Sequence, residues 1–218
     1  MPAKREEIRQ RILHQALVLA PFEGWTSLML GHAAEKAGFA RLEAERVFPN
    51  GIPEILEKLN EDADRQLESI VAGTAAFKEF KIREKIAFCV KTRLSAQTAH
   101  KEAIRRAVAY TILPQNAALG LKTLYRTVDT IWRLAGDTST DFNFYTKRML
   151  LAKVYSATLL YWLDDASAEH TDTWQFLTRQ INGVLAFGKW KAKTEERGRN
   201  IMKASQKFWR EWRPRPLA

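Results

Sequence analysis

The sequence predicts an all-α fold. Apolar residues recur at the spacing of one helical face through most of the chain, beginning with Ile8, Ile12 and Ala16. The β-branched residues are scattered and show no alternation that would indicate successive strands. Glycines and prolines divide the helical pattern into segments, and no segment repeats at a fixed period. We therefore expect helices packed on helices, with no sheet.

Breakers set the expected limits of these helices. The first helix should stop at the break Pro21–Trp25, and Thr26 or Ser27 offers a side-chain oxygen that can cap the second. Pro49 and Gly51 end the third helix, and residues 136–140 form a loop between two long helices. The second helix should follow this cap and end near Gly38. We expect the other helices over residues 4–20, 42–47, 53–72, 82–97, 100–112, 115–135, 141–164, 170–187 and 195–212.

The first sixty residues have the order of a helix-turn-helix module: a long helix, a turn, a short helix, a tight turn and another short helix. We expect this module over residues 1–52, a larger helical domain over 53–188 and a basic tail over 189–218. A DNA reader needs positive charge to neutralise phosphate. Residues 1–60 contain eight Lys/Arg and eight Asp/Glu, a balance that argues against binding to nucleic acid.

The tail carries most of the net charge. Residues 189–218 hold ten Lys/Arg and three Glu, which is +7 out of +10 for the chain. A helix here places an apolar, tryptophan-bearing face opposite a basic face, a pattern typical of a helix lying in an anionic membrane surface. The same pattern could serve a partner groove or nucleic acid. The expected membrane-binding residues are Ile201, Met202, Phe208, Trp209, Trp212, Lys203, Lys207 and Arg210.

Composition limits the compartment. The only cysteine, Cys89, has no intrachain partner, which favours a reducing compartment. No apolar run reaches the roughly 18–20 residues that span a bilayer. The first residues include Lys4 and Glu6 but no apolar core of a signal peptide. The sequence thus predicts a bacterial-type cytoplasmic protein that is peripheral at the inner membrane.

Catalytic chemistry has little support in the sequence. The histidines, His14, His32, His100 and His170, do not have the spacing of a helix-borne metal site. Glycine-rich phosphate loops and nucleophile elbows are missing as well. We expect a protein that is not an enzyme and has no cofactor or metal.

One stretch is specific enough to indicate a family. Residues 135–148 read AGDTSTDFNFYTKR, preceded by Val128–Trp132 and followed by Tyr155–Thr158 and Asp172–Leu177. Together these segments resemble the coenzyme Q (ubiquinone) biosynthesis accessory proteins, the "Coq nine" family, over residues 6–187. The segment Gly31–Phe39 also resembles the first helix and turn of the tetracycline-repressor class.

The resemblance implies a tetracycline-repressor-like fold that has lost DNA binding and gained a lipid site. It implies binding of phospholipid and isoprenoid quinone intermediates, and assistance to the di-iron hydroxylase that acts on demethoxyubiquinone. Arg148, with Lys147 beside it, matches the family's position near a phospholipid head group, and Tyr155 completes the expected lipid-binding set. The repressor-like fold also implies a homodimer through residues 141–164 and 170–187.

Asp141, Phe144 and Tyr145 match the family's surface patch for the hydroxylase. Most family members have Trp where this chain has Phe144, so an aromatic anchor is kept but the indole N–H donor is lost. Each residue also has a purely structural interpretation. Asp141 can complement a helix dipole, Arg148 can be an ordinary ion-pair partner, and Tyr155 can belong to the core.

The resemblance thus implies a lipid-binding accessory protein that presents its substrate to the hydroxylase. Two alternatives remain open at this point. A transcriptional regulator would use the N-terminal module on DNA and an apolar pocket as ligand sensor. A peripheral membrane protein would bind vesicles through its tail and carry no specific cargo.

Overall fold

The computed structural model describes residues 2–138 and 142–184. The chain divides into two compact units, Met1–Leu177 and Thr178–Ala218, and the cavity and ion pairs considered below lie in the first. In the second unit, residues 178–184 are helical. The expected domain limits at residues 52 and 188 stay a prediction.

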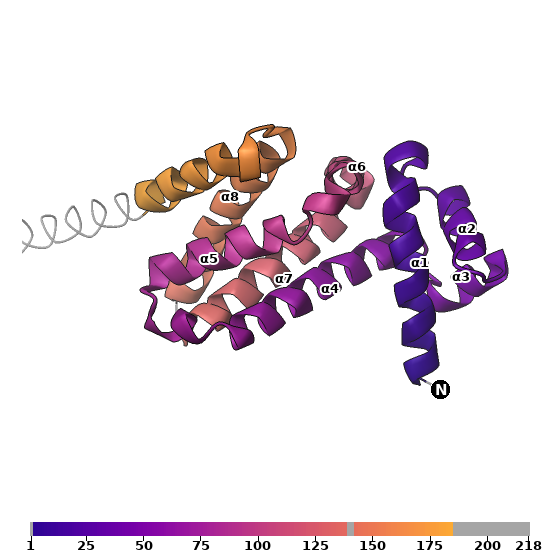
Figure 1. Ribbon diagram of the computed structural model, residues 1–218, viewed down its shortest axis with the longest axis horizontal. Helices are drawn as coiled ribbons and strands as arrows, with labels where there is room; N and C mark the ends of the chain where they lie inside the picture. Colours follow the sequence, from indigo (N-terminus) through magenta and orange to yellow (C-terminus); the bar gives the residue numbers. More distant parts are fainter. Residues whose placement is uncertain (1, 139–141, 185–218) are drawn as a thin grey trace, which may run out of the picture. The chain divides into compact units, whose positions relative to one another are not determined.

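Helices make up all the regular structure of the described residues, which confirms the all-α prediction. Helices α1, α4, α7 and α8 are the long ones (Figure 1). Short 3-10 turns connect several helices, and residues 171–177 begin a further helix. The α-helices are α1 (Pro2–Glu23), α2 (Ser27–Lys36), α3 (Arg41–Val47), α4 (Ile52–Gly73), α5 (Ile82–Ser95), α6 (Lys101–Ile112), α7 (Ala117–Ala135) and α8 (Phe142–Asp164).

Helix α1 continues through Pro21 to Glu23, so the break expected at Pro21 is wrong. A proline this close to the end of a helix removes one N–H donor without cutting the helix in two. The next turn is still closed, because the Gly24 N–H donates to the Ala20 carbonyl at 3.0 Å. Gly24 then adopts φ 72°, a left-handed conformation that glycine accepts without a steric cost and that ends the helix.

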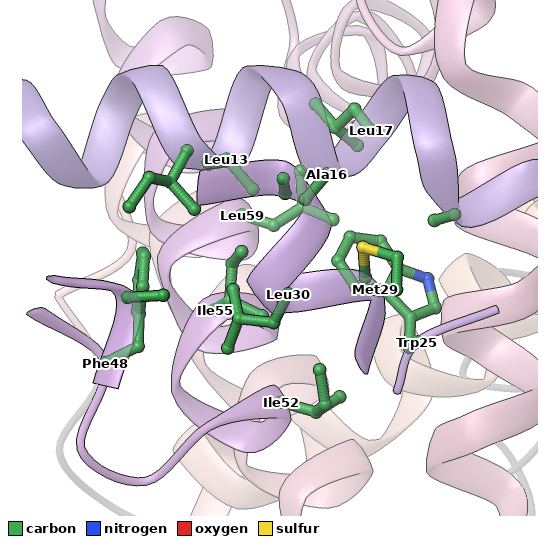
Figure 2. Close-up of a cluster of buried hydrophobic side chains, with 14 of the residues drawn as sticks. Leu13, Ala16, Leu17, Trp25, Met29, Leu30, Phe48, Ile52, Ile55 and Leu59 are labelled. Atoms are coloured by element: carbon green, nitrogen blue, oxygen red, sulfur yellow. The ribbon is translucent and has the colours of Figure 1, made fainter. Parts of the chain in front are cut away.

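Helices α1, α2 and α3 form the expected helix-turn-helix-like arrangement. The Thr26 side chain accepts a hydrogen bond from the Met29 N–H at 3.1 Å, which confirms a cap at the start of α2. Gly38, with φ 84°, provides the turn after α2. The side chains of α1 and α2 meet those of α3 and of the first turns of α4 in one buried apolar cluster (Figure 2).

Two arginines of α1 hold the ends of α2 and α3. Arg11 donates to the Ala37 carbonyl at 2.7 Å, directly after α2. Arg9 donates to the carbonyl of Val47, the last residue of α3, at 3.1 Å, and to Glu54 at 2.7 Å. Cationic side chains satisfy the unpaired carbonyls that a helix leaves at its C-terminus. These bases therefore stabilise the module itself.

Helix α4 leads from this module into the larger helical part. Helices α4, α5 and α7 run side by side, and α8 packs on α7 (Figure 1). Trp25, in the turn between α1 and α2, is buried, and its indole N–H donates to the Ala103 carbonyl of α6 at 3.0 Å. Lys58 of α4 is buried as well and pairs with Glu6 of α1 and with Asp62. These contacts join the module to the helices that surround the cavity.

Among the described helices, none combines the length and the apolar character that a membrane crossing requires. The basic tail, residues 189–218, lies outside the described residues. The membrane-binding set predicted there, from Ile201 to Trp212, stays a prediction.

Candidate functional site

A cavity of about 450 Å³ lies among helices α4 to α8. Its size falls in the range of about 300–1,000 Å³ that is usual for small-molecule sites. Most of its walls are apolar. The apolar walls include Leu56 and Leu59 of α4, Ile104 and Val108 of α6, Leu121 and Leu124 of α7, and Leu159 and Leu160 of α8. Such a lining suits an apolar ligand.

One part of the wall is a buried polar cluster centred on Arg93 of α5. Arg93 Nε donates to Asp64 Oδ1 at 2.8 Å, and Nη2 donates to Asn60 Oδ1 at 3.1 Å. Arg93 Nη1 donates to the hydroxyl oxygen of Tyr155 on α8. Thr127 of α7 donates to Asp64 Oδ1 at 3.2 Å. Four helices thus contribute to one hydrogen-bonded network.

Burial and pairing set the charge state of this cluster. Burial raises the pKa of the Tyr155 phenol, which therefore stays protonated. Burial alone would lower the pKa of Arg93, but the neighbouring Tyr155 and Asp64 outweigh it and raise that pKa. Arg93 remains a cation that faces one carboxylate, Asp64. The cluster therefore combines a balanced ion pair with a neutral hydroxyl group.

The cavity opens between apolar side chains. Ile112 at the end of α6 and Leu121 on α7 are 67% and 68% exposed, and Leu160 on α8 is 52% exposed. All three line the cavity. A cluster of exposed large apolar side chains is typical of a surface that binds a ligand or a membrane. We call these three residues the apolar rim.

The described residues of 135–148, the stretch with the family resemblance, lie at the corner between α7 and α8. Arg148 is buried and pairs with Asp129 at 2.7 Å and with Asp137 at 3.3 Å. Lys147 pairs with Asp137 at 2.7 Å. The Trp132 indole N–H donates to the Lys147 carbonyl at 3.1 Å. Side chains between Asp129 and Arg148, which lie close together in the sequence, therefore contact each other at this corner.

The structure separates the predicted lipid-binding residues. Tyr155 lines the cavity. Arg148 and Lys147 lie at the α7–α8 corner, and the cavity walls do not include them. The ion-pair interpretation of Arg148 fits these contacts. Their contact with a phospholipid head group stays a prediction.

The predicted partner patch is only partly described, because Asp141 lies outside the described residues. Tyr145 is 65% exposed, and its ring makes an edge contact with Phe144 at 5.2 Å between centroids. The Phe144 ring in turn covers the Arg148 guanidinium. Met149, one turn beyond Tyr145, is 72% exposed. An exposed aromatic and a methionine thus share one face of α8.

The polar cluster around Arg93 is not among the sites predicted from the sequence. A signal was present, because Arg93 follows Cys89 and Val90 at helical spacing and Asp64 lies between Ala63 and Leu67. Charged residues on an apolar helical face are seldom buried unless they are paired. Nothing in the sequence alone tells which charge pairs with which.

No group of three or more His, Cys, Asp or Glu side chains that could hold a metal ion occurs in the part of the chain that the structure describes. The absence of cofactor and metal stays a prediction.

Comparison with known proteins gives the family. A family model described as COQ9 matches residues 117–188. "Ubiquinone biosynthesis protein COQ9, mitochondrial" of Rattus norvegicus is 34% identical over 190 residues, 84% of this chain and 60% of the relative. Its counterpart in Homo sapiens is 32% identical, over 84% of this chain and 59% of the relative. The chain thus spans about 60% of the length of these relatives.

A solved structure confirms the predicted fold class. The TetR transcriptional regulator from Nitrosomonas europaea ATCC 19718 superposes with a TM-score of 0.66. The match covers 81% of this chain and 97% of the regulator, at 19% sequence identity. At this low identity the match shows a shared fold alone and carries no conclusion about function.

The predicted bacterial-type cytoplasmic location is wrong, because the relatives in Rattus norvegicus, Homo sapiens and Bos taurus are all named mitochondrial. The prediction rested on the lone Cys89 and on the first few residues. A lone cysteine lacks an intrachain partner in any compartment, so it could not separate these locations.

The matched relatives, the family model and the repressor-like fold agree with the resemblance found in residues 6–187. This chain belongs to the COQ9 family.

Proposed function

We propose that this chain is a lipid-binding accessory protein of ubiquinone biosynthesis, which holds isoprenoid quinone intermediates or phospholipid in the cavity among α4 to α8. The observation that carries the proposal is the cavity of about 450 Å³ with apolar walls and an apolar rim. Each Å² of apolar ligand surface removed from water contributes about 25 cal/mol to binding. The assignment to ubiquinone biosynthesis comes from the names of the relatives.

The proposal needs no catalytic group of the chain. At the polar cluster of the cavity wall, Arg93 forms an ion pair with Asp64. Cys89 is buried, and burial raises the pKa of its thiol to about 12, which leaves almost no nucleophilic thiolate. The role of the chain is to bind and present, while a partner enzyme performs the reaction.

The exposed face of α8 is the proposed surface for that partner, the di-iron demethoxyubiquinone hydroxylase. Tyr145 and Met149 are exposed one helical turn apart. Aromatic residues and methionine are enriched at the centres of protein interfaces. The contact would place the partner's surface beside the α7–α8 corner, near Phe144.

The regulator alternative finds less support in the N-terminal module. In α3, where a repressor would read DNA, Arg41 pairs with Glu35 at 2.6 Å and Arg46 pairs with Glu43 at 3.5 Å. Bases that already face carboxylates contribute little to the neutralisation of phosphate. Duplex DNA binding by a variant without residues 189–218 would support the regulator instead.

A matched pair of alanines tests the cavity. Ala107 on α6 lines the cavity, whereas Ala109 on the same helix is exposed and lies outside it. Ala107→Phe places a ring in the space that the ligand needs, so binding of decylubiquinone should fall at least about tenfold. Ala109→Phe should bind as the wild type does.

Binding is measured by quenching of tryptophan fluorescence, since Trp162 lines the cavity. Thermal unfolding of each variant checks that the fold is kept. Equal affinity of Ala107→Phe and wild type would place the ligand elsewhere. A wild type that binds no decylubiquinone would refute the proposed function.

A further inference from the structure

The cavity is polar at its buried end and apolar at its exposed end. Tyr155 and Arg93 are 4% and 6% exposed, whereas Ile112 and Leu121 at the apolar rim are 67% and 68% exposed. A pocket that buries a lipid tail and leaves the head group in water needs the opposite order. The polar part of a ligand therefore fits best at the buried end of this cavity.

The Tyr155 hydroxyl has an unused donor. Its oxygen accepts a hydrogen bond from Arg93 Nη1. A phenol can donate one hydrogen bond in addition to those it accepts. Among the described residues no acceptor receives the Tyr155 hydrogen, although the side chain is buried and lines the cavity. A buried donor without an acceptor costs free energy, which a ligand oxygen would recover.

The charge balance of the cluster selects the kind of oxygen. Arg93 is paired with Asp64 at 2.8 Å, and both side chains are almost completely buried. Since the carboxylate already neutralises the guanidinium, a second anion such as a phosphate would be left uncompensated in a buried site. A neutral oxygen acceptor adds no charge, so it fits the Tyr155 donor.

We propose that the cavity takes its ligand head first: a neutral ring oxygen accepts a hydrogen bond from Tyr155, and the apolar tail leaves between Ile112, Leu121 and Leu160. The inference rests on the proposed function and adds the orientation of the ligand. The ring oxygen can be a quinone carbonyl or a phenol hydroxyl, which offer the same acceptor. A tail that emerges between apolar side chains stays in contact with apolar surface along its way out.

The orientation is tested with the full chain and decylubiquinone whose tail ends in a photoreactive diazirine. After irradiation, mass spectrometry of peptides locates the attachment. Head-first binding places the label on the apolar rim, at Ile112, Leu121 or Leu160. Label on Arg93, Thr127 or Tyr155 would show that the tail end lies at the polar cluster and would overturn the inference.

The role of the hydroxyl is tested with Tyr155→Phe, which removes the donor and keeps the ring. Decylubiquinone and decylphenol carry ring oxygens, and decylbenzene carries none. Loss of one neutral hydrogen bond should weaken binding of an oxygen-bearing probe about three- to tenfold. Affinity for decylbenzene should stay the same. The probe that loses more affinity identifies the quinone or the phenol as the better match.

Tyr125→Phe is the matched control, because Tyr125 is exposed on α7 and does not line the cavity. It should leave all three affinities unchanged. If Tyr155→Phe weakens the binding of decylbenzene as much as that of decylubiquinone, the hydroxyl group affects only packing. The inference then fails while the proposed function stands. If the wild type binds none of the probes, both fail.

Discussion

The guanidinium of Arg93 on α5 donates a hydrogen bond to the hydroxyl oxygen of Tyr155 on α8, at the wall of the cavity. The same guanidinium is paired with Asp64 of α4. The Arg93 side chain thereby connects helices α4, α5 and α8. It also positions the Tyr155 hydroxyl group at the cavity wall. The packing of these helices and the proposed recognition of a ligand therefore depend on the same cluster.

The first prediction concerns this buried pair. Arg93→Met leaves the Asp64 carboxylate buried without its cation, which should lower the free energy of unfolding by about 3–5 kcal/mol. The double variant Arg93→Met, Asp64→Leu removes both charges and should recover most of the loss. Urea denaturation followed by circular dichroism measures both values.

Lys122→Met serves as control for that series. Lys122 pairs with Glu57 at 2.7 Å, but its side chain is 65% exposed. An exposed pair contributes at most about 1 kcal/mol. A loss for Arg93→Met no larger than the loss for Lys122→Met would show that the buried pair does not hold the helices together.

The second prediction concerns Asp165, directly after α8. Burial alone would raise the pKa of its carboxyl, but hydrogen bonds from Thr173 and Ser167 outweigh burial and hold that pKa below its usual range. A lowered folded-state pKa stabilises the protein above the unfolded-state value of about 4, and this part is lost as the pH falls further. Near pH 7, Asp165→Asn should cost about 1–3 kcal/mol.

The difference in unfolding free energy between wild type and Asp165→Asn should therefore shrink as the pH drops below about 4. Denaturation at several pH values measures it. Asp164→Asn is the neighbouring control, since the Asp164 side chain is 80% exposed and its pairing with Arg105 is worth about 1 kcal/mol or less. A difference that stays constant with pH would contradict the assigned hydrogen bonds.

The third prediction uses the single cysteine as a probe. Cys89 is completely buried, and burial raises the pKa of its thiol to about 12. Because the thiolate is the reactive species, native protein should react with Ellman's reagent on the order of 1,000-fold more slowly than protein in urea. Rapid reaction of the native protein would place Cys89 at the surface.

The fourth prediction concerns the tail, where Trp209 lies at the margin of the expected apolar face and Gln206 lies on the polar side of a helix. Trp209→Glu and Gln206→Glu change the net charge equally. Only Trp209→Glu should remove most of the binding to anionic vesicles, because it puts a charge where apolar contact with lipid is expected. Vesicle sedimentation measures the bound fraction, and equal loss in both variants would refute the predicted orientation.

The fold could be predicted from the sequence because its determinants are local. Helical spacing from Ile8 to Ala16 and the cap at Thr26 act within one or two turns. Helix α1 ends later than predicted, because a proline near the end of a helix is tolerated. The helix ends directly before Gly24 and not at Pro21, and the spacing of apolar residues does not show which of the two breakers ends it.

The candidate site could be predicted only in part. Tyr155 was expected at the lipid site and lines the cavity, but Arg93 and Asp64 come from other helices. Their pairing is a contact between residues 29 positions apart, which a helical period cannot reveal. Arg148 was assigned to a head group by resemblance, and its ion pairs with Asp129 and Asp137 became visible only in three dimensions.

We propose above all that this chain carries a lipid. Native mass spectrometry of the purified full chain, combined with lipid extraction, tests it most directly. We expect a population of protein that is heavier than the chain by the mass of a prenylated quinone intermediate or a phospholipid. This population should be smaller in Ala107→Phe. Protein that purifies without lipid and takes up none from quinone-loaded vesicles would contradict it.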